Sequence, residues 1–409
     1  MDLISKIFHI DKSRYQLALD VGTESAKALV FLSDNKDEKV IIRGVGLKKH
    51  KTGSMHGGAV FDLEGVIENC RSAINEAESA AKVKPAMATI SIGGEYSKNL
   101  TQTYSFERGD EKTRISLLEL EEMIRRAQEK VREFSKNVLK WQDAKLISAD
   151  VVDFSIDGYR VINPVSFKGK NIRITVSNSY IAKEQYDVTK KIASGLNVEL
   201  SRISYGPYAV LKAIGAQDIM KFNAIFIDVG GGTTDVIVIR NRNIEDDKFF
   251  LYGGKAFTKS ISSALDVDMN NAEKIKLEYS EGKISGEIKG AIEKTVKMDL
   301  DIWSEGVGIC FEELSKNNLL PSRIMLYGGG SHLPGIKEQI ERLVRVNKYP
   351  FSDKPEVSFI SPSDVVSTVD MTNSANTMQF VTAISLANLS LDLANEEDLP
   401  NQILKKMLL

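Results

Sequence analysis

Residues 224–239 read AIFIDVGGGTTDVIVI, and this stretch decides the fold. Two apolar runs rich in β-branched residues flank the glycines, which predicts a strand, a tight turn and a second strand. Gly230, Gly231 and Gly232 carry no Cβ, so backbone N–H groups in the bend can approach an anion. Thr233 and Thr234 add hydroxyl donors there. Asp228, at the end of the first strand, is placed to orient a hydrated divalent cation. A glycine hairpin with nothing bound is the competing interpretation of the isolated motif.

A second copy of this pattern near the start of the chain strengthens the binding interpretation. Asp20, Val21, Gly22 and Thr23 end one apolar run and lead through Lys27 into another, about half the chain before the first motif. Two such units predict two related lobes that each offer an Asp-x-Gly turn to one ligand between them. The ligand that such a pair of turns suits most economically is a nucleotide polyphosphate with a metal ion. Asp20 and Asp228 are the metal candidates, each through water.

A third glycine turn follows the apolar run 324–327. Gly328, Gly329, Gly330 and Ser331 form it, and a helix is expected from Pro334. Glycine-rich backbone lets a flat base or a ribose approach closely, so we interpret this turn as the nucleoside contact. A tight connection between a strand and a helix is the competing interpretation.

Composition narrows the class of protein. The chain has 409 residues, 27% of them charged, with a net charge of −2, so nothing favours nucleic acid or an acidic polymer as a partner. Cys70 and Cys310 are far apart in apolar helical contexts, which predicts reduced core residues. The four histidines show no metal-ligand spacing, and no apolar run is long enough to cross a bilayer. We therefore expect a cytoplasmic protein.

The remaining patterns outline the lobes and an insertion. After the strand expected at 87–92, residues 97–170 read as a small α+β unit whose helix is capped by Ser116, with Glu119 three residues later. A long helical pattern spans 287–318, and its Gly306–Gly308 segment is expected to break or bend it. Other expected elements are strands at 16–20, 27–32, 40–47, 145–153, 159–162, 172–181, 199–205 and 249–254, and helices at 182–194, 256–265, 271–279 and 376–389.

Both ends of the chain carry apolar residues at helical spacing. These are Leu3, Ile4, Ile7 and Phe8 at the start, and Ile403, Leu404, Met407 and Leu408 at the finish. Two interpretations stay open for these segments. They either touch a membrane weakly or pack on the chain's own lobes.

The three turns, in this order, resemble the phosphate 1, phosphate 2 and adenosine motifs of the actin, Hsp70 and sugar-kinase ATPase superfamily. Within it the chain looks most like the FtsA family of bacterial cell division, over roughly residues 16–390. Residues 157–164 (DGYRVINP), with Gly169, resemble that family's Asn-Pro passage, and 272–276 (AEKIK) its Ala-Glu-x-Ile-Lys segment. The PilM family of type IV pilus assembly, which has an insertion at the same position, is the first alternative. A small-molecule kinase is the second.

The resemblance implies an α/β fold of the actin-like ATPase type, with two lobes around a nucleotide cleft and an α+β insertion of the 1C type. Its implied ligands are ATP and Mg²⁺, with Gly253, Gly254, Glu273 and Lys276 as further binding residues. The implied domains are 1–96, the N-terminal part of the first lobe; 97–170, the insertion; 171–205, the first lobe continued; 206–365, the second lobe; 366–393, a helix returning to the first lobe; and 394–409, a linker and short amphipathic tail.

The same resemblance implies a filament-forming protein on the inner face of the cell membrane. Its expected partners are further copies of itself through residues 97–170, a tubulin-like division GTPase, and the membrane through the chain ends. Many relatives in the superfamily carry a water-orienting glutamate before a Pro-x-Ala helix, where this chain has Gly206 before Pro207. Hydrolysis is therefore expected to be slow or absent, and no catalytic residue is assigned.

Overall fold

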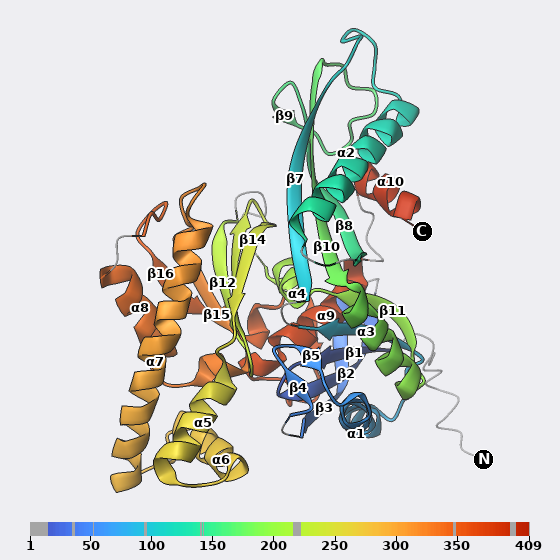
Figure 1. Cartoon of the computed structure of the whole chain (residues 1–409). Helices are drawn as coiled ribbons and strands as arrows, with labels where there is room; N and C mark the ends of the chain where they lie inside the picture. Colours follow the sequence, from blue (N-terminus) through green and yellow to red (C-terminus); the bar gives the residue numbers. More distant parts are fainter. Residues whose placement is uncertain are drawn as a thin grey trace, which may run out of the picture.

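The computed structural model describes residues 15–34, 37–51, 53–93, 96–139, 141, 143–215, 222–346, 349–392 and 398–408. Two mixed β-sheets with helices form two lobes that stand side by side, and a third sheet projects from the first lobe (Figure 1). The predicted architecture of two α/β lobes is therefore present. The predicted strand-turn-strand units lie at the centre of the two lobes.

The first lobe is a six-stranded sheet in the order β11-β6-β1-β2-β3-β17. Its strands are β1 (Tyr15–Val21), β2 (Ser25–Asp34), β3 (Lys39–Lys49), β6 (Met87–Ile92), β11 (Glu199–Ser204) and β17 (Thr368–Asp370). Helices α1 (Leu63–Ala81) and α3 (Lys183–Leu196) cover one face, and α4 (Gly206–Ala213) and α9 (Val381–Asp392) the other. A short hairpin, β4 (Met55–His56) and β5 (Ala59–Val60), precedes α1.

Strand β1 shows why the sheet is buried on both faces. Leu17, Leu19 and Val21 pack toward α1 and α3, whereas Ala18 between them packs toward α4 and α9. Successive side chains of a strand point to opposite faces, so a strand covered on both sides is apolar throughout.

The second lobe repeats the first. Its strands are β12 (Ala224–Val229), β13 (Thr234–Arg240), β14 (Asn243–Phe250), β15 (Arg323–Tyr327) and β16 (Glu356–Phe359). In the order β16-β15-β12-β13-β14 they have the same neighbours and directions as β11-β6-β1-β2-β3. Its helices are α5 (Gly254–Leu265), α6 (Met269–Ser280), α7 (Glu287–Leu314) and α8 (Ile336–Val346), with 3-10 turns η4 (Gly329–His332), η5 (Pro362–Asp364) and η6 (Met378–Phe380). The two-lobe repeat predicted from the Asp-x-Gly turns is present.

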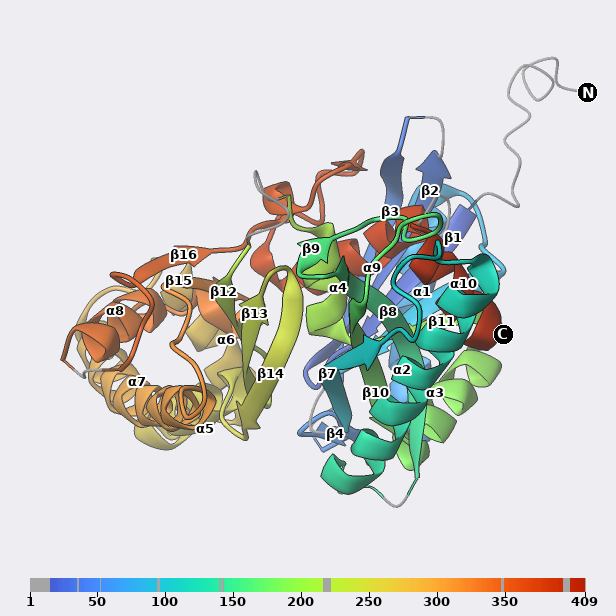
Figure 2. The ribbon, with the colours of Figure 1, turned by 90° about the horizontal axis from the view of Figure 1, so that it is seen from above.

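Helices α4 and α9 lie between the two sheets and join the lobes (Figure 2). Phe31 of the first lobe and Phe226 of the second belong to the same buried cluster, together with Tyr208 of α4 and Ile384 of α9. The spacing of the two sheets, and therefore of their glycine turns, is set by this shared core.

The third sheet has the order β7-β10-β8-β9. Its strands are β7 (Ser97–Glu107), β8 (Ala144–Ile156), β9 (Tyr159–Arg160) and β10 (Asn171–Ala182), and α2 (Leu117–Val138) packs on it. The Ser116 side chain accepts a hydrogen bond from the Glu119 amide, as the predicted cap requires. The strand at 172–181 was expected both as a strand of the insertion and as the point where the first lobe resumes. It pairs along its whole length with β7 and β8, so it belongs to the third sheet. The residue bounds of the domains stay predictions.

Helix α7 is continuous from Glu287 to Leu314, so the predicted break at Gly306–Gly308 is wrong. A Cβ on Gly306 would lie 2.7 Å from the Phe250 ring, and one on Gly308 would lie 2.6 Å from the Tyr349 hydroxyl. These glycines let aromatic side chains pack against the helix backbone. The expected strand at 249–254 also differs, because β14 ends at Phe250 and α5 begins at Gly254.

The C-terminal helix α10 (Leu399–Leu408) packs against α2 of the third sheet (Figure 1). Ile403 and Leu404 are buried there, and the Asn401 amide exchanges hydrogen bonds of 2.7 and 2.9 Å with the backbone of Val151. The interpretation of Ile403 and Leu404 as membrane contacts is therefore not supported, because they face the protein. Leu3, Ile4, Ile7 and Phe8 lie outside the described residues, as does the side chain of Leu408. Among the described helices, none is long and apolar enough to cross a membrane.

We predict that Leu404→Asp destabilises the α2–α10 contact by about 3 kcal/mol or more, because Leu404 is fully buried and a carboxylate there has no partner. Met407→Asp is the matched control, since Met407 on the same helix is 39% exposed. Hydrogen exchange of α2 and α10 measures the effect. Equal exchange in the two variants would contradict this packing.

Candidate functional site

A cavity of about 490 Å³ lies between the two lobes, with walls from both. The end of β1 contributes Asp20, the turn after it contributes Gly22 and Thr23, and β2 contributes Lys27. The remaining predicted residues on the wall come from the second lobe: Asp228, Gly230, Gly231, Thr233, Gly254, Glu273, Lys276, Gly328, Gly329 and Gly330. Fourteen of the eighteen predicted site residues therefore line one space.

The two phosphate-type turns close in the same way. The Gly22 amide donates to the Ser25 carbonyl at 3.1 Å, and the Gly230 amide donates to the Thr233 carbonyl at 2.9 Å. The amides of Glu24 and Gly231, which both line the cavity, have no acceptor within the described part of the chain. Unsatisfied N–H groups beside a cavity are donors for an anion.

The same turns touch across the cleft. A Cβ on Gly231 would lie 2.7 Å from the Cβ of Glu24, and one on Gly232 would lie 2.9 Å from the Cγ2 of Thr23. Gly232 thus serves the contact between the lobes and does not line the cavity. Gly253 does not line the cavity either, and it allows close packing within the second lobe, because its Cβ would lie 2.6 Å from the Gly230 carbonyl oxygen.

Three aspartates of the described chain, Asp20, Asp228 and Asp235, face the cavity, and Lys27 pairs with one of them. Lys27 donates to Asp20 at 2.9 Å, whereas the pKa of Asp228 is raised by burial and then by the charges of Asp235 and Asp20. Burial, and then the charge of Asp247, raises the pKa of Asp235 to about 7. Such crowding favours an added positive charge. No group of three or more described His, Cys, Asp or Glu residues has the geometry to hold a metal ion.

Helices α5 and α6 form a polar wall on the second-lobe side. Lys276 Nζ donates to the Gly254 carbonyl at 2.9 Å and to Thr258 Oγ1 at 2.8 Å, and it pairs with Glu273 at 2.7 Å. Lys49 of the first lobe reaches Glu273 at 3.5 Å, so this wall also contacts the opposite lobe.

The third glycine turn closes the cavity near η4 and η6. Gly328 has φ +89°, and a Cβ there would lie 2.2 Å from Asp228 Oδ1, so glycine is required. A Cβ on Gly329 would meet the Gln379 Cβ at 3.5 Å, an ordinary contact. Ser331 does not line the cavity, because its hydroxyl donates back to the Gly328 carbonyl at 2.6 Å.

Thr234 also differs from its predicted role. Its hydroxyl is buried, donates to the Tyr252 carbonyl at 2.7 Å and accepts from Trp303 Nε1 at 2.9 Å. These bonds fix the turn against α7. Of the two threonines in this turn, Thr233 lines the cavity.

Sequence reasoning missed several residues of the wall. Asp235 and Glu24 stood within the recognised motifs, and the register that pairs Asp235 with Asp228 was available from the hairpin. Lys255 directly follows the predicted Gly253 and Gly254 but was given no role. Lys49 and Gln379 come from segments without a motif, so no local signal pointed to those two.

Gly206, in the place expected for a water-orienting glutamate, lines the cavity at the start of α4. A Cβ there would lie 3.3 Å from Thr382 Cγ2 and 3.6 Å from Ser91 Oγ. This corner is therefore formed by small and hydroxyl-bearing groups and holds no carboxylate at position 206.

His50 lies behind the first turn, with its amide donating to the Glu24 carbonyl. Burial, and then the charges of Lys255 and Lys27, lowers the pKa of its imidazole to about 4. Because the unfolded chain takes up this proton near pH 6.5 and the folded chain near pH 4, the folded state loses stability as the pH falls between these values.

We predict that the wild type loses about 2 kcal/mol of unfolding free energy through His50 between pH 7 and pH 5, and that His50→Gln does not. Urea unfolding of both proteins at the two pH values measures the difference. Parallel pH profiles would show that His50 titrates normally in the folded chain.

Comparison with known proteins gives a consistent result. A family model described as "Cell division protein FtsA" matches residues 225–385. The cell division protein FtsA of Neisseria meningitidis serogroup B is 26% identical over 353 residues, covering 81% of this chain and 82% of that protein. FtsA of Streptococcus pneumoniae serotype 2 is 26% identical over 357 residues, covering 81% and 74%.

Solved structures give the fold. The PilM-PilN type IV pilus biogenesis complex contains a chain with a TM-score of 0.65 at 14% identity, covering 92% of this chain and 98% of that one. The ethanolamine utilization protein EutJ of Carboxydothermus hydrogenoformans has a TM-score of 0.52 at 15% identity, covering 91% and 89%. These similarities show that the chain has the actin-like fold, with the cavity between its two lobes. Within that fold class the sequence is similar to FtsA over four-fifths of its length, and the predicted resemblance is confirmed.

Proposed function

We propose that this chain is an actin-like cytoskeletal protein of the FtsA type that binds ATP with Mg²⁺ between its lobes. The observation that carries the proposal is the meeting of two equivalent Asp-x-Gly turns at one cavity, each closed by the same backbone hydrogen bond. The sequence similarity to cell division proteins over most of the chain supports the division role.

The cavity fits a metal-bound polyphosphate by its chemistry. The free amides of Glu24 and Gly231 and the side chains of Lys27 and Thr233 are donors for phosphate oxygens. Asp20 and Asp228 would hold a magnesium ion through its water ligands, and the ion would neutralise phosphate charge. The polar wall of Glu273 and Lys276 and the turn at Gly328–Gly330 remain for the nucleoside.

The part of the cavity around Gly206 supports a proposal that the chain binds ATP but hydrolyses it slowly. Orienting a water for in-line attack is a large part of phosphoryl-transfer catalysis, and this corner supplies no carboxylate at position 206. We therefore propose a nucleotide-gated scaffold with slow or no hydrolysis.

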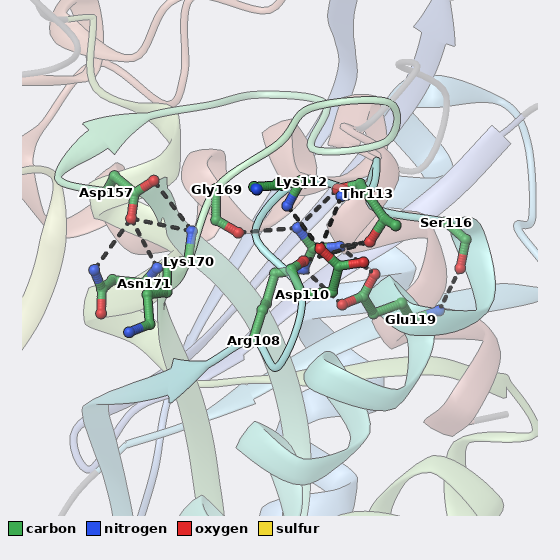
Figure 3. A network of polar contacts seen from close by, with 10 residues as sticks. All are labelled: Arg108, Asp110, Lys112, Thr113, Ser116, Glu119, Asp157, Gly169, Lys170 and Asn171. Carbon is green, nitrogen blue, oxygen red and sulfur yellow. Dashed lines mark hydrogen bonds and ion pairs between the residues drawn. The ribbon is translucent and has the colours of Figure 1, made fainter.

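Self-association through the insertion extends the proposal. At its distal end, Arg108 pairs with Glu119 at 2.6 Å and donates to the Gly169 carbonyl at 2.9 Å, and Asp157 accepts from the Asn171 amide at 2.7 Å (Figure 3). This network fixes loops that leave apolar side chains in solvent: Leu118, Tyr159, Ile162 and Phe167. A fixed, exposed apolar end suits contact with another copy, and an open head-to-tail contact makes filaments.

Further partners of the FtsA type, a tubulin-like division GTPase and the inner membrane surface, belong to the same proposal and rest on the sequence similarity alone. A PilM-like role in type IV pilus assembly is the alternative, and the structural similarity supports it at the level of fold. A small-molecule kinase would need an acceptor site and a catalytic base, and Gly206 supplies none where the family would place a carboxylate.

We predict that Asp228→Ala removes magnesium-dependent ATP binding and that Gly329→Val lowers ATP affinity at least about tenfold by filling the nucleoside site. Position 329 is chosen because its Cβ makes an ordinary contact, so the substitution leaves the fold intact. Calorimetry with Mg-ATP measures both effects. Unchanged affinity in both variants would refute the nucleotide site.

We also predict that Ile162→Asp abolishes nucleotide-dependent filaments while nucleotide binding is kept, because a charge replaces a side chain that is 71% exposed at the distal end. Ile162→Leu is the matched control and keeps the filaments. Sedimentation and electron microscopy provide the readout. Normal filaments in Ile162→Asp would place the polymer contact elsewhere.

A further inference from the structure

Four lysines line the cavity, and their partners differ. Lys27 pairs with Asp20, and Lys276 with Glu273, in each case within one lobe. Lys49 shares Glu273 with Lys276. Lys255 pairs across the cleft with Glu24, at 3.2 Å between Nζ and Oε2, and Glu24 belongs to the first phosphate-type turn.

The backbone on both sides of this pair is fixed. The Lys255 amide donates to the Gly231 carbonyl at 2.8 Å, and the Gly254 amide donates to the Gly230 carbonyl at 2.9 Å. The Glu24 carbonyl accepts from the His50 amide at 2.8 Å. The first amides of α5 therefore already have acceptors and are not free to bind an anion. At the start of α5 the Lys255 side chain is the group that can bind one.

The Lys255 and Glu24 side chains are both 30% exposed and line the cavity. The Glu24 oxygen that faces the Lys255 ammonium is buried and accepts no hydrogen bond from the described residues, so the ion pair is its interaction. A carboxylate on a turn that faces phosphate repels the ligand unless a cation neutralises it. A phosphate that reaches both turns therefore competes with Glu24 for Lys255 and forms a charge-assisted hydrogen bond.

We propose that Lys255 binds the terminal phosphate of the nucleotide, and that Glu24 holds Lys255 across the cleft when no third phosphate is present. The pair then distinguishes a triphosphate from a diphosphate and reports the difference to both lobes. This inference rests on the proposed nucleotide site and adds a residue that the sequence motifs do not contain.

The test compares binding of the magnesium complexes of ADP and of a non-hydrolysable ATP analogue to the full chain by calorimetry. Lys255→Gln should weaken the triphosphate about tenfold and the diphosphate less than about threefold, because one charged contact to the third phosphate is lost. Lys255→Arg should keep most of the preference. Glu24→Gln should bind the triphosphate more tightly than the wild type, because it frees Lys255.

Lys259→Gln is the matched control, since Lys259 is exposed one turn further along α5 and does not line the cavity. It should bind both nucleotides as the wild type does. If Lys255→Gln weakens both nucleotides equally, or neither, the inference fails while the nucleotide site stands. If the wild type binds neither nucleotide, the proposed function and this inference fail together.

Discussion

The rest of the structure depends on a close contact between the lobes that two glycines allow because they have no Cβ. Gly231 and Gly232 of the second lobe approach Glu24 and Thr23 of the first so closely that a Cβ on either glycine would fall inside 3 Å. The shared core around α4 and α9 holds the sheets at that spacing. A larger residue in either turn would push the lobes apart at the cavity, where a small displacement changes every ligand contact at once. The glycines are thus needed to bring the two lobes together, in addition to the phosphate contact proposed for them.

Much of this arrangement was predictable because it depends on short sequence patterns. Unbroken apolar runs beside Asp-x-Gly turns identify strands buried on both faces, and their repetition identifies two lobes. The cap at Ser116 and the strand ends at Asp20 and Asp228 follow from short patterns whose physical reason lies within a few residues. Fourteen predicted site residues meet at the cavity for that reason.

The parts that were not predictable depend on contacts between distant segments. The sequence of β10 is compatible with a strand of the first sheet or of the third. Its pairing with β7 and β8 shows that it belongs to the third. The glycines of α7 resemble a helix break until Phe250 and Tyr349 are found packed on them. Ile403 and Leu404 have the spacing of a membrane-surface helix, and the apolar face of α2 provides the partner that buries them. In each case the sequence identified the strand or helix, but not the distant segment that packs against it.

The third sheet links the two lobes a second time. It is covalently part of the first lobe, yet Lys98 on β7 pairs with Asp246 of β14 at 3.2 Å, and the Thr101 hydroxyl donates to the Ile244 carbonyl at 2.6 Å. Both bonds connect edge strands, β7 of the third sheet and β14 of the second lobe. A rotation of the lobes about the shared core must therefore break these bonds or carry the third sheet with it. Since β13 joins β14 directly to the phosphate-type turn, a continuous path of these bonds and of strand pairing connects the start of β7 in the insertion to the cavity between the lobes.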